Sequence, residues 1–378
     1  MGGPTTQSSP LRKPLDAIPP ELAAPSDYER LAPEFIEAAA LALISGGSGG
    51  EQSLRANVQA LADIELHSRI LQDFDAASTR ITLLGQVFRH PVLLAPISAQ
   101  TLVHPQGEFA TAAGASDQQA GLVVSTLASQ PMEEIAAQTD APKWFQLYIQ
   151  PEHESTRTLI ERAENAGFTA LMVTLNAPIQ KPSYRAMRAG FVLPDHARPA
   201  NLGASAKRPP VVLRPDQSPI FQGMMSEAPG WDELARVLEQ TSLPTIAKGV
   251  THPQDAKRLI DMGINAMVVS NHGGRALDAM PASLHCLPGI REAVGDEFPL
   301  LMDGGIQSGY DVFKAIAMGA DAVMIGRLQV YALAVAGSLG VAHLIKLVRD
   351  ELELAMAQTG CTSIESINRE CLFTRAGA

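Results

Sequence analysis

From residue 91 onward, the sequence alternates between short apolar runs and segments in which apolar residues recur at helical spacing. The apolar runs are rich in Val, Ile and Leu and lie at eight places: 91–99, 122–127, 143–149, 170–177, 244–249, 266–271, 300–305 and 322–327. The helical segments between them include 108–119, 132–138, 154–166, 231–240, 253–262 and 310–318. This alternation indicates a parallel sheet whose faces are covered by helices.

Eight such strands favour an α/β fold of the (β/α)8 TIM barrel type. The span from residue 91 to residue 327 is about 237 residues long, close to the roughly 250 residues usual for this fold. A doubly wound open sheet is the alternative. It is weakened because no Gly-x-Gly-x-x-Gly motif follows the first strand.

The regions outside the alternation suggest how the chain is organised. Residues 1–27 are rich in proline and lack a hydrophobic period, which predicts a flexible arm with no packing role. Residues 28–378 are predicted to form one barrel domain. Its lead-in, residues 28–44, has helical spacing and is followed by a glycine-rich run at 46–50, which we expect to end that helix.

A proline-rich insertion at about 178–229 interrupts the alternation after the fourth strand. An insertion at this point of a barrel lies at the catalytic face, which predicts a mobile lid. The alternative is a disordered linker between two half-domains.

The composition limits the class of protein. Hydrophobic residues make up 46% of the chain and charged residues 18%, which excludes wholesale disorder. The net charge is −11, so a nucleic-acid partner is not expected. The three cysteines, Cys286, Cys361 and Cys371, lack metal-binding spacing and read as reduced thiols of a cytoplasmic protein. Neither a membrane span nor a secretory signal is apparent.

Polar residues at the ends of the predicted strands are the candidates for chemistry, because barrel enzymes place their sites there. The sixth strand leads into Ser270-Asn271-His272-Gly273-Gly274-Arg275. His272 would supply a base near neutral pH beside the fixed cation Arg275. Taken alone, the motif could also be a tight turn with a hydrogen-bonded histidine.

Further strand ends carry groups suited to an anionic or electron-rich ligand. Lys248 closes the fifth strand and is costly to bury unless it faces such a ligand. Glycine-rich loops after the last two strands, with Arg327, suit phosphate binding. Gln146 and Thr174 could hydrogen-bond a flat heterocycle, and Tyr148 could reach a substrate oxygen. Each residue alone is more often structural; five strand ends together favour a site.

These motifs also carry a family resemblance. The segments are Leu94-Ala95-Pro96, His104–Glu108, Trp144–Tyr148, Lys248-Gly249, Ser270–Arg275, Asp303–Gly305 and Ile325–Arg327. Together they resemble the FMN-dependent α-hydroxy acid oxidase/dehydrogenase family, which includes glycolate oxidase, lactate oxidase and mandelate dehydrogenase. The resemblance extends over about residues 28–370.

The resemblance implies that FMN lies across the barrel mouth. The residues that would hold its ring are Pro96, Ile97, Ser98, Ala99, Ser125, Gln146, Thr174 and Lys248. The residues that would hold its ribityl chain and phosphate are Ser270, Asp303, Gly304, Gly305, Gln307, Gly326 and Arg327. His272 would take a proton from the substrate, Arg275 would bind its carboxylate, and Tyr148 would contact the reacting oxygen. Lys248 would stabilise negative charge on the reduced flavin.

The sequence departs from the family pattern near the substrate. Leu43 replaces a carboxylate-binding tyrosine, Ser183 the second substrate-binding arginine, Gln307 the arginine of a phosphate loop, and Leu127 an aromatic residue of several members. Asn176 stands where the family has an aspartate that pairs with the catalytic histidine. Asparagine can accept a hydrogen bond but does not stabilise an imidazolium by charge.

Three hypotheses follow for the function. The first is an FMN-dependent oxidoreductase that acts on a 2-hydroxy acid, slowly or with a bulkier apolar substrate. The second is an FMN enzyme repurposed for an amine, a neutral alcohol or a biosynthetic intermediate. The third is a flavin-binding module without turnover. The expected partners are a small-molecule substrate and an electron acceptor (oxygen, a quinone or a protein), and the resemblance implies a homotetramer.

Overall fold

Eight parallel strands close into a barrel in the order β10-β11-β4-β5-β6-β7-β8-β9. The computed structural model describes residues 10–178, 183–203 and 212–373. The strands are β4 (Val92–Leu94), β5 (Gly121–Ser125), β6 (Lys143–Leu147), β7 (Leu171–Thr174), β8 (Thr245–Val250), β9 (Ala266–Val269), β10 (Leu300–Asp303) and β11 (Ala322–Ile325). Each lies within or next to a predicted strand, so the predicted TIM barrel is confirmed and the open sheet is wrong.

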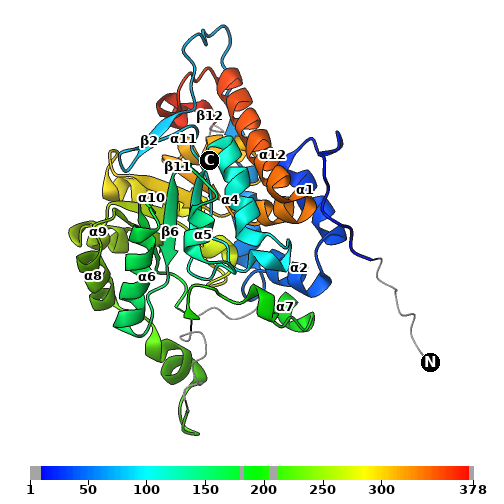
Figure 1. The fold of residues 1–378 in the computed structure, drawn as a ribbon. Helices are drawn as coiled ribbons and strands as arrows, with labels where there is room; N and C mark the ends of the chain where they lie inside the picture. The colour runs from blue at the N-terminus through cyan, green and yellow to red at the C-terminus, as the bar shows by residue number, and fades with distance from the viewer. Residues whose placement is uncertain (1–9, 179–182, 204–211, 374–378) are drawn as a thin grey trace.

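Helices cover the outside of the barrel, as the alternation predicts (Figure 1). They are α4 (Gly107–Gln118), α5 (Met132–Ala136), α6 (His153–Asn165), α8 (Trp231–Gln240), α9 (Pro253–Asp261), α10 (Ser283–Val294), α11 (Gly309–Ala317) and α12 (Arg327–Thr359). Six agree with predicted helices to within a few residues. The predicted helices did not include α10, which contains Pro288.

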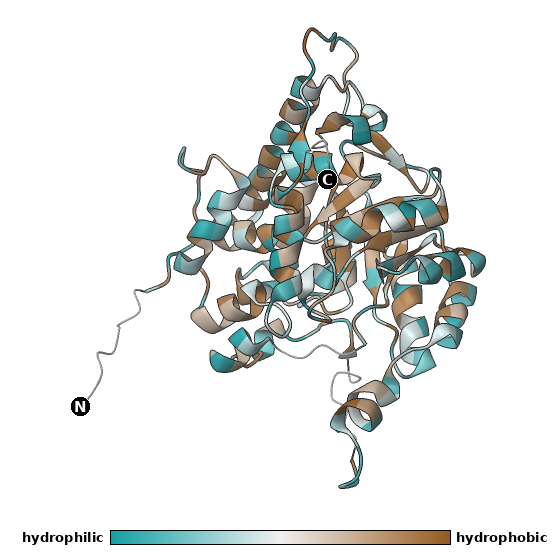
Figure 2. Cartoon of the chain, turned by 180° about the vertical axis from the view of Figure 1, so that it is seen from behind, coloured by the Kyte–Doolittle hydropathy of each residue, from teal (hydrophilic) through white to brown (hydrophobic). Residues whose placement is uncertain are grey.

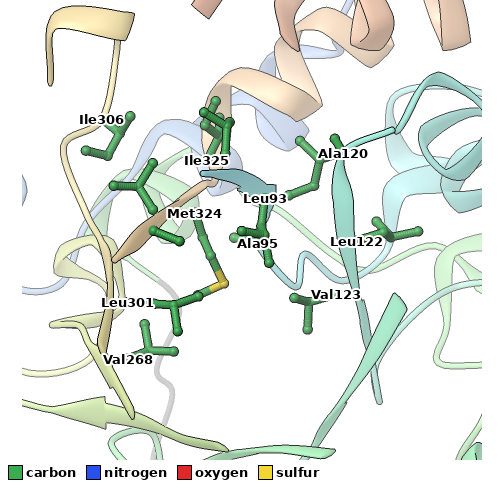
Figure 3. Packing of buried hydrophobic residues seen from close by; sticks show 14 of the residues in the cluster. Leu93, Ala95, Ala120, Leu122, Val123, Val268, Leu301, Ile306, Met324 and Ile325 are labelled. Carbon is green, nitrogen blue, oxygen red and sulfur yellow. The ribbon is translucent and has the colours of Figure 1, made fainter. Parts of the chain in front are cut away.

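The barrel strands are buried on both faces, which explains why they read as continuous apolar runs rather than alternating ones. Side chains from different strands fill the interior. Figure 3 shows Met324 of β11 reaching toward Leu301 of β10, with Leu93 and Val123 on the neighbouring strands. This filling makes the barrel a packed core and leaves its mouth as the place for a ligand.

The lead-in is not the single helix predicted over residues 28–44. It forms α1 (Pro25–Leu31), a 3-10 turn η1 (Ala32–Glu34) and α2 (Ala38–Ser45). Pro33 lies at the break and contributes to it, because it has no N–H to continue the helical hydrogen bonds, although Ala32 before it keeps helical geometry. The carboxylate of Glu37 then caps α2 by accepting hydrogen bonds from two backbone N–H groups. As predicted, the glycine-rich run ends this helix, and α3 (Gln52–Ala62) follows.

The prediction of an N-terminal arm without a packing role is wrong for part of residues 10–27. Leu22 is buried, and the N–H of Leu15 donates to the carbonyl of Val335 on α12 at 2.8 Å. In Figure 1 the blue lead-in lies beside the orange α12. Apolar residues spaced among prolines pack here without forming a helix, so no helical periodicity in the sequence indicates their burial. Residues 1–9 of this prediction lie outside the described residues.

The insertion after β7 lies at the end of the barrel to which the strands point, as Figure 1 shows for β6 and α7 (Tyr184–Arg188). Its other elements are short helical turns: η3 (Asp195–Ala197), η5 (Pro219–Gly223) and η6 (Met224–Glu227). The alternative of a linker between half-domains is wrong, because β7 pairs directly with β8 across the insertion. Residues 179–182 and 204–211 of the predicted lid lie outside the described residues.

Two small sheets complete the fold: β1 (Glu65–Leu66) with β12 (Leu372–Phe373), and β2 (Ile81–Leu83) with β3 (Gln86–Phe88). Of the helices in the described part of the chain, α12 alone has the length and apolar composition of a membrane span. However, 83% of its most apolar window is buried inside the structure. Figure 2 shows apolar colouring also on the turn Pro219–Glu227, where Phe221 is exposed.

Candidate active site

A cavity of about 650 Å³ opens at the C-terminal ends of the barrel strands. Every site residue expected from the sequence lines this cavity except Asn176 and Ser270. Asn176 and Ser270 lie behind the cavity wall and hydrogen-bond to residues that form it. The structure therefore brings the expected residues together around one cavity and places Asn176 and Ser270 in supporting positions.

His272 reaches the cavity from a tight turn that follows β9. Its backbone φ is +59°, and Gly273 and Gly274 continue in the same left-handed region, at +60° and +73°. A Cβ on Gly274 would lie 2.5 Å from the backbone nitrogen of Leu54, so only glycine fits there. The strain at His272 is offset locally, because its N–H donates to the Ser270 hydroxyl at 3.0 Å.

Asn176 fixes the tautomer of His272. Its amide Nδ2 donates to the carbonyl of Ser270 at 2.9 Å, which leaves Oδ1 facing His272 Nδ1 at 3.2 Å. Since Oδ1 can only accept, the imidazole proton sits on Nδ1 and Nε2 carries the lone pair. Gly249 gives Asn176 its room, because a Cβ there would lie 2.3 Å from the amide carbon. Asn176 thus lies beside His272, where the resemblance places the family's aspartate.

Burial is the main cause that lowers the pKa of His272, to about 3, and the positive charges of Lys248, Arg275 and Arg327 act in the same direction. Asp303 acts in the opposite direction and does not compensate. At neutral pH the imidazole is therefore neutral and able to accept a proton. An anionic ligand in the cavity would make the imidazolium less costly.

Lys248, Ser270 and Asp303 form one buried charge network. Lys248 Nζ donates to Asp303 Oδ2 at 2.5 Å and to Ser270 Oγ at 3.0 Å, and Ser270 Oγ donates to Asp303 Oδ1 at 2.5 Å. The ammonium is thus held at one position in the cavity wall, with its charge paired. This arrangement suits a residue that must stabilise negative charge on a ligand without moving.

Backbone carbonyls at the end of α2 hold both predicted anion-binding arginines. Arg275 Nη1 donates to the carbonyls of Leu43 at 2.7 Å, Ile44 at 3.3 Å and Gly46 at 3.0 Å. Arg327 donates to the carbonyls of Ile44, Gly46 and Gly273, each at 3.0 Å. Burial lowers the pKa of Arg275 to about 10. These bonds use only Nη1 of Arg275. Within the described residues no bond uses its Nε or Nη2, so both remain available for a ligand carboxylate.

Gln146 presents an unsatisfied donor to the cavity. Its Oε1 accepts a hydrogen bond from Ser125 Oγ at 3.1 Å, but its Nε2 is buried without an acceptor in the described residues. A buried amide N–H without a partner costs free energy, so a ligand carbonyl or ring nitrogen is expected opposite it. An isoalloxazine ring offers such acceptors, and the donor set of this cavity fits FMN.

Backbone N–H groups that suit a phosphate, named here the phosphate cradle, lie at another part of the cavity. Neither Gly305 nor Ile306 donates its backbone N–H to any residue in the described ranges, and the first turn of α12 has no side-chain cap. A Cβ on Gly326 would meet nothing within 4 Å, so this position leaves open space at the helix N-terminus. Such N–H groups bind phosphate without needing a cation.

The substituted positions occupy different places around the cavity. Leu43 and Leu127 line it and make part of its wall apolar. Ser183 does not; it caps α7, and its Oγ lies 2.3 Å from where a Cβ on Gly46 would be. Arg185, two residues later, lines the cavity and donates to Glu51 Oε2 at 2.5 Å and to Ser45 Oγ at 3.2 Å.

Asn57 is a functional-site residue that the sequence did not reveal. It lines the cavity from α3 and pairs its amide with that of Asn271 through bonds of 2.8 and 2.9 Å. The Asn57 backbone also packs where a Cβ on Gly305 would sit, 2.5 Å away. It therefore joins the histidine turn to the phosphate cradle. An asparagine on the apolar face of a helix was the available signal.

Comparison with known proteins agrees with this geometry. A family model described as FMN-dependent dehydrogenase matches residues 32–374. An L-lactate oxidase from Alicycliphilus denitrificans is 48% identical over 359 residues, which cover 95% of this chain and 98% of that relative. A 4-hydroxymandelate oxidase from Amycolatopsis orientalis is 38% identical, with 93% and 98% covered.

The solved structures agree in fold. A crystal structure of mandelate oxidase with benzoylformic acid is 37% identical and superimposes with a TM-score of 0.84, over 94% of this chain and 99% of that one. The shared family, fold and cavity show that this chain is a flavin-dependent enzyme. The hypothesis of a flavin-binding module without turnover is therefore wrong.

Proposed function

This chain belongs to the FMN-dependent dehydrogenase family, and from that premise we propose that it oxidises L-2-hydroxy acids with short apolar side chains to 2-oxo acids. FMN is the cofactor of this family and accepts the two electrons removed from the substrate. The observation that carries the proposal is the placement of His272, with its proton on Nδ1, in the same cavity wall as Arg275 and Tyr148.

Arg275 is the proposed ligand of the substrate carboxylate. Its guanidinium is oriented by three carbonyls on Nη1, so little freedom is lost when the remaining donors bind an anion. Arg185 is a second candidate, because it lines the cavity where Ser183 does not. We propose that it replaces part of the carboxylate contact that Leu43 and Ser183 have removed.

His272 is the proposed base. Its Nε2 lone pair takes a proton from the substrate, and Asn176 Oδ1 holds the Nδ1 proton in place during the transfer. The bound carboxylate supplies negative charge that a family aspartate would otherwise supply beside the imidazolium. Lys248, fixed by Asp303, supplies positive charge for the reduced cofactor.

The apolar lining supports a substrate with an alkyl side chain. The side chains of Leu43, Leu102 and Leu127 cannot form hydrogen bonds, and these residues line the cavity. A polar or charged substrate side chain would therefore lose its hydration there. Lactate and its longer aliphatic homologues fit this surface. The relatives named L-lactate oxidase, at 48%, 43% and 38% identity, support the same choice, and their name favours oxygen as the electron acceptor.

Anaerobic mixing tests the proposal. L-Lactate and L-2-hydroxy acids with four to six carbons should bleach the flavin of the purified protein, and admission of air should restore the colour and produce hydrogen peroxide. Bleaching by amines or neutral alcohols, with none by hydroxy acids, would support a repurposed oxidation instead. Bleaching by hydroxy acids without recovery in air would leave the substrate assignment standing and replace oxygen with a quinone or protein acceptor.

A further inference from the structure

The phosphate end of the cavity contains a carboxylate. Glu29 of α1 lines the same cavity as the backbone N–H groups of the phosphate cradle, Gly305 and Ile306. Its Oε2 accepts a hydrogen bond from Gln307 Nε2 at 3.4 Å. A negative charge is unexpected beside a site for a phosphate dianion, because like charges repel and raise the free energy of the complex.

Gln307 brings no cation beside Glu29, and the neighbouring Arg327 and Arg30 are already engaged. The side chain of Gln307 is neutral. Its backbone N–H donates to Asp311 Oδ2 at 3.0 Å, so this N–H is already bonded within the loop. Arg327 lines the cavity, but its guanidinium donates to three backbone carbonyls. Arg30, next to Glu29, is bonded to Asp27.

Glu29 acts electrostatically within this end of the cavity. It is one of the charges that raise the pKa of Arg327 against the larger lowering by burial, and it also raises the pKa of Tyr331 on the next turn of α12. The carboxylate is exposed at the cavity rim. In the described residues its hydrogen-bond partner is the side-chain amide of Gln307, and it caps no helix. Its removal therefore changes the charge of the site without removing core packing.

We propose that the Glu29–Gln307 pair lowers the affinity of this chain for the phosphate of FMN, so that the cavity distinguishes FMN from riboflavin less strongly than its backbone cradle would allow. The inference rests on the proposed placement of the FMN phosphate at this cradle. The flavin is then held mainly by its ring, through Gln146, Lys248 and their neighbours. The chain should release FMN readily, and it should accept riboflavin.

Flavin titration of the full-length protein tests this proposal. Bound flavin is removed, and FMN or riboflavin is added back while the quenching of flavin fluorescence is followed. Glu29→Gln should lower the dissociation constant of FMN by roughly 3- to 10-fold at low salt, as expected for one charge removed near a dianion in partly exposed surroundings. The dissociation constant of riboflavin should stay within about 2-fold. Gln307→Arg should act in the same direction as Glu29→Gln.

Glu34→Gln is the matched control, because Glu34 is an exposed acid of the same lead-in that pairs with Arg12 outside the cavity. An equal change in the dissociation constants of both flavins would overturn the proposal, since Glu29 would then act through the fold. No change in either dissociation constant would overturn it as well. Failure of the proposed function looks different: flavin affinities would respond as described while no hydroxy acid bleached the flavin.

Discussion

Asn176 Oδ1 lies 3.2 Å from His272 Nδ1, while the other end of the same amide donates to the Ser270 carbonyl. The asparagine thus orients the imidazole as a carboxylate would but contributes no charge. This difference separates two properties of a catalytic histidine that usually occur together: its tautomer, which is fixed here, and the stability of its protonated form, which is low.

Asn176→Asp should therefore raise the pKa of His272 and speed substrate oxidation. We expect anaerobic flavin bleaching at pH 8 to become about 10-fold faster, with its acid limb moved to higher pH, because a carboxylate stabilises the imidazolium. The variant should also lose some thermal stability, since Asp cannot donate to the Ser270 carbonyl. Asn176→Leu, of similar size, should slow the reaction. Unchanged rate and pH dependence in Asn176→Asp would contradict the role given to this residue.

His272→Gln should abolish flavin reduction and also change how stability depends on pH. An unfolded histidine binds a proton below about pH 6.5, whereas the folded chain resists protonation of His272 until about pH 3. Stability from this residue is therefore complete above pH 6.5 and is lost as the pH falls toward 3.

Urea unfolding of the flavin-free protein measures this effect. Between pH 7.5 and pH 5 the wild-type chain should lose about 2 kcal/mol more than His272→Gln does. His196→Gln, at an exposed position, should behave like the wild type. An identical pH dependence in all three proteins would mean that His272 is not held neutral by burial.

Arg185→Ala should raise the KM for L-lactate by about 10-fold, with a smaller effect on kcat, because a charge-assisted contact to the carboxylate is removed. Arg188→Ala is the matched control, because Arg188 lies on the same helix but does not line the cavity and faces Tyr184 instead. Steady-state kinetics on both variants distinguishes the two outcomes. Equal changes in the two variants would assign the effect to α7 as a whole.

Gln146→Met should weaken FMN binding by about 10-fold and cost the flavin-free protein only the hydrogen bond from Ser125 Oγ, about 1 kcal/mol. The buried Nε2 has no acceptor before a ligand binds, so its removal costs the empty protein little, while the complex loses a hydrogen bond. Fluorescence titration and thermal unfolding measure the two quantities. A loss of stability without a loss of affinity would show that Gln146 serves the fold.

Leu127→Phe should narrow the apolar part of the cavity. We expect kcat/KM for a six-carbon 2-hydroxy acid to fall by at least 10-fold, while that for L-lactate changes less than 3-fold, since the larger ring displaces only the longer alkyl chain. A parallel fall for both substrates would place the substrate side chain elsewhere.

The sequence predicted the strands and most covering helices well, because a strand buried on both faces must be a continuous apolar run. Where it failed, a local feature overrode the pattern. Pro33 divided the lead-in helix, and Leu15 and Leu22 packed without any period to signal it. The substitution of Ser183 also needed the structure, which shows that an arginine there would displace a helix cap and meet Gly46.

By itself, the sequence determined which side chains reach the mouth of the barrel, because the ends of parallel strands converge at one face whatever the loops do. Only the tertiary structure decided how those side chains are held. Partners distant in the chain decide which nitrogen of a histidine carries the proton and which nitrogens of a guanidinium are already bonded. Examples are Asn176 for His272 and Gly46 for Arg275. In the same way, the contact of Glu29 with Gln307 joins two distant parts of the chain. Hydrogen bonds and charges act through space, and the order of residues along a chain does not encode those distances directly.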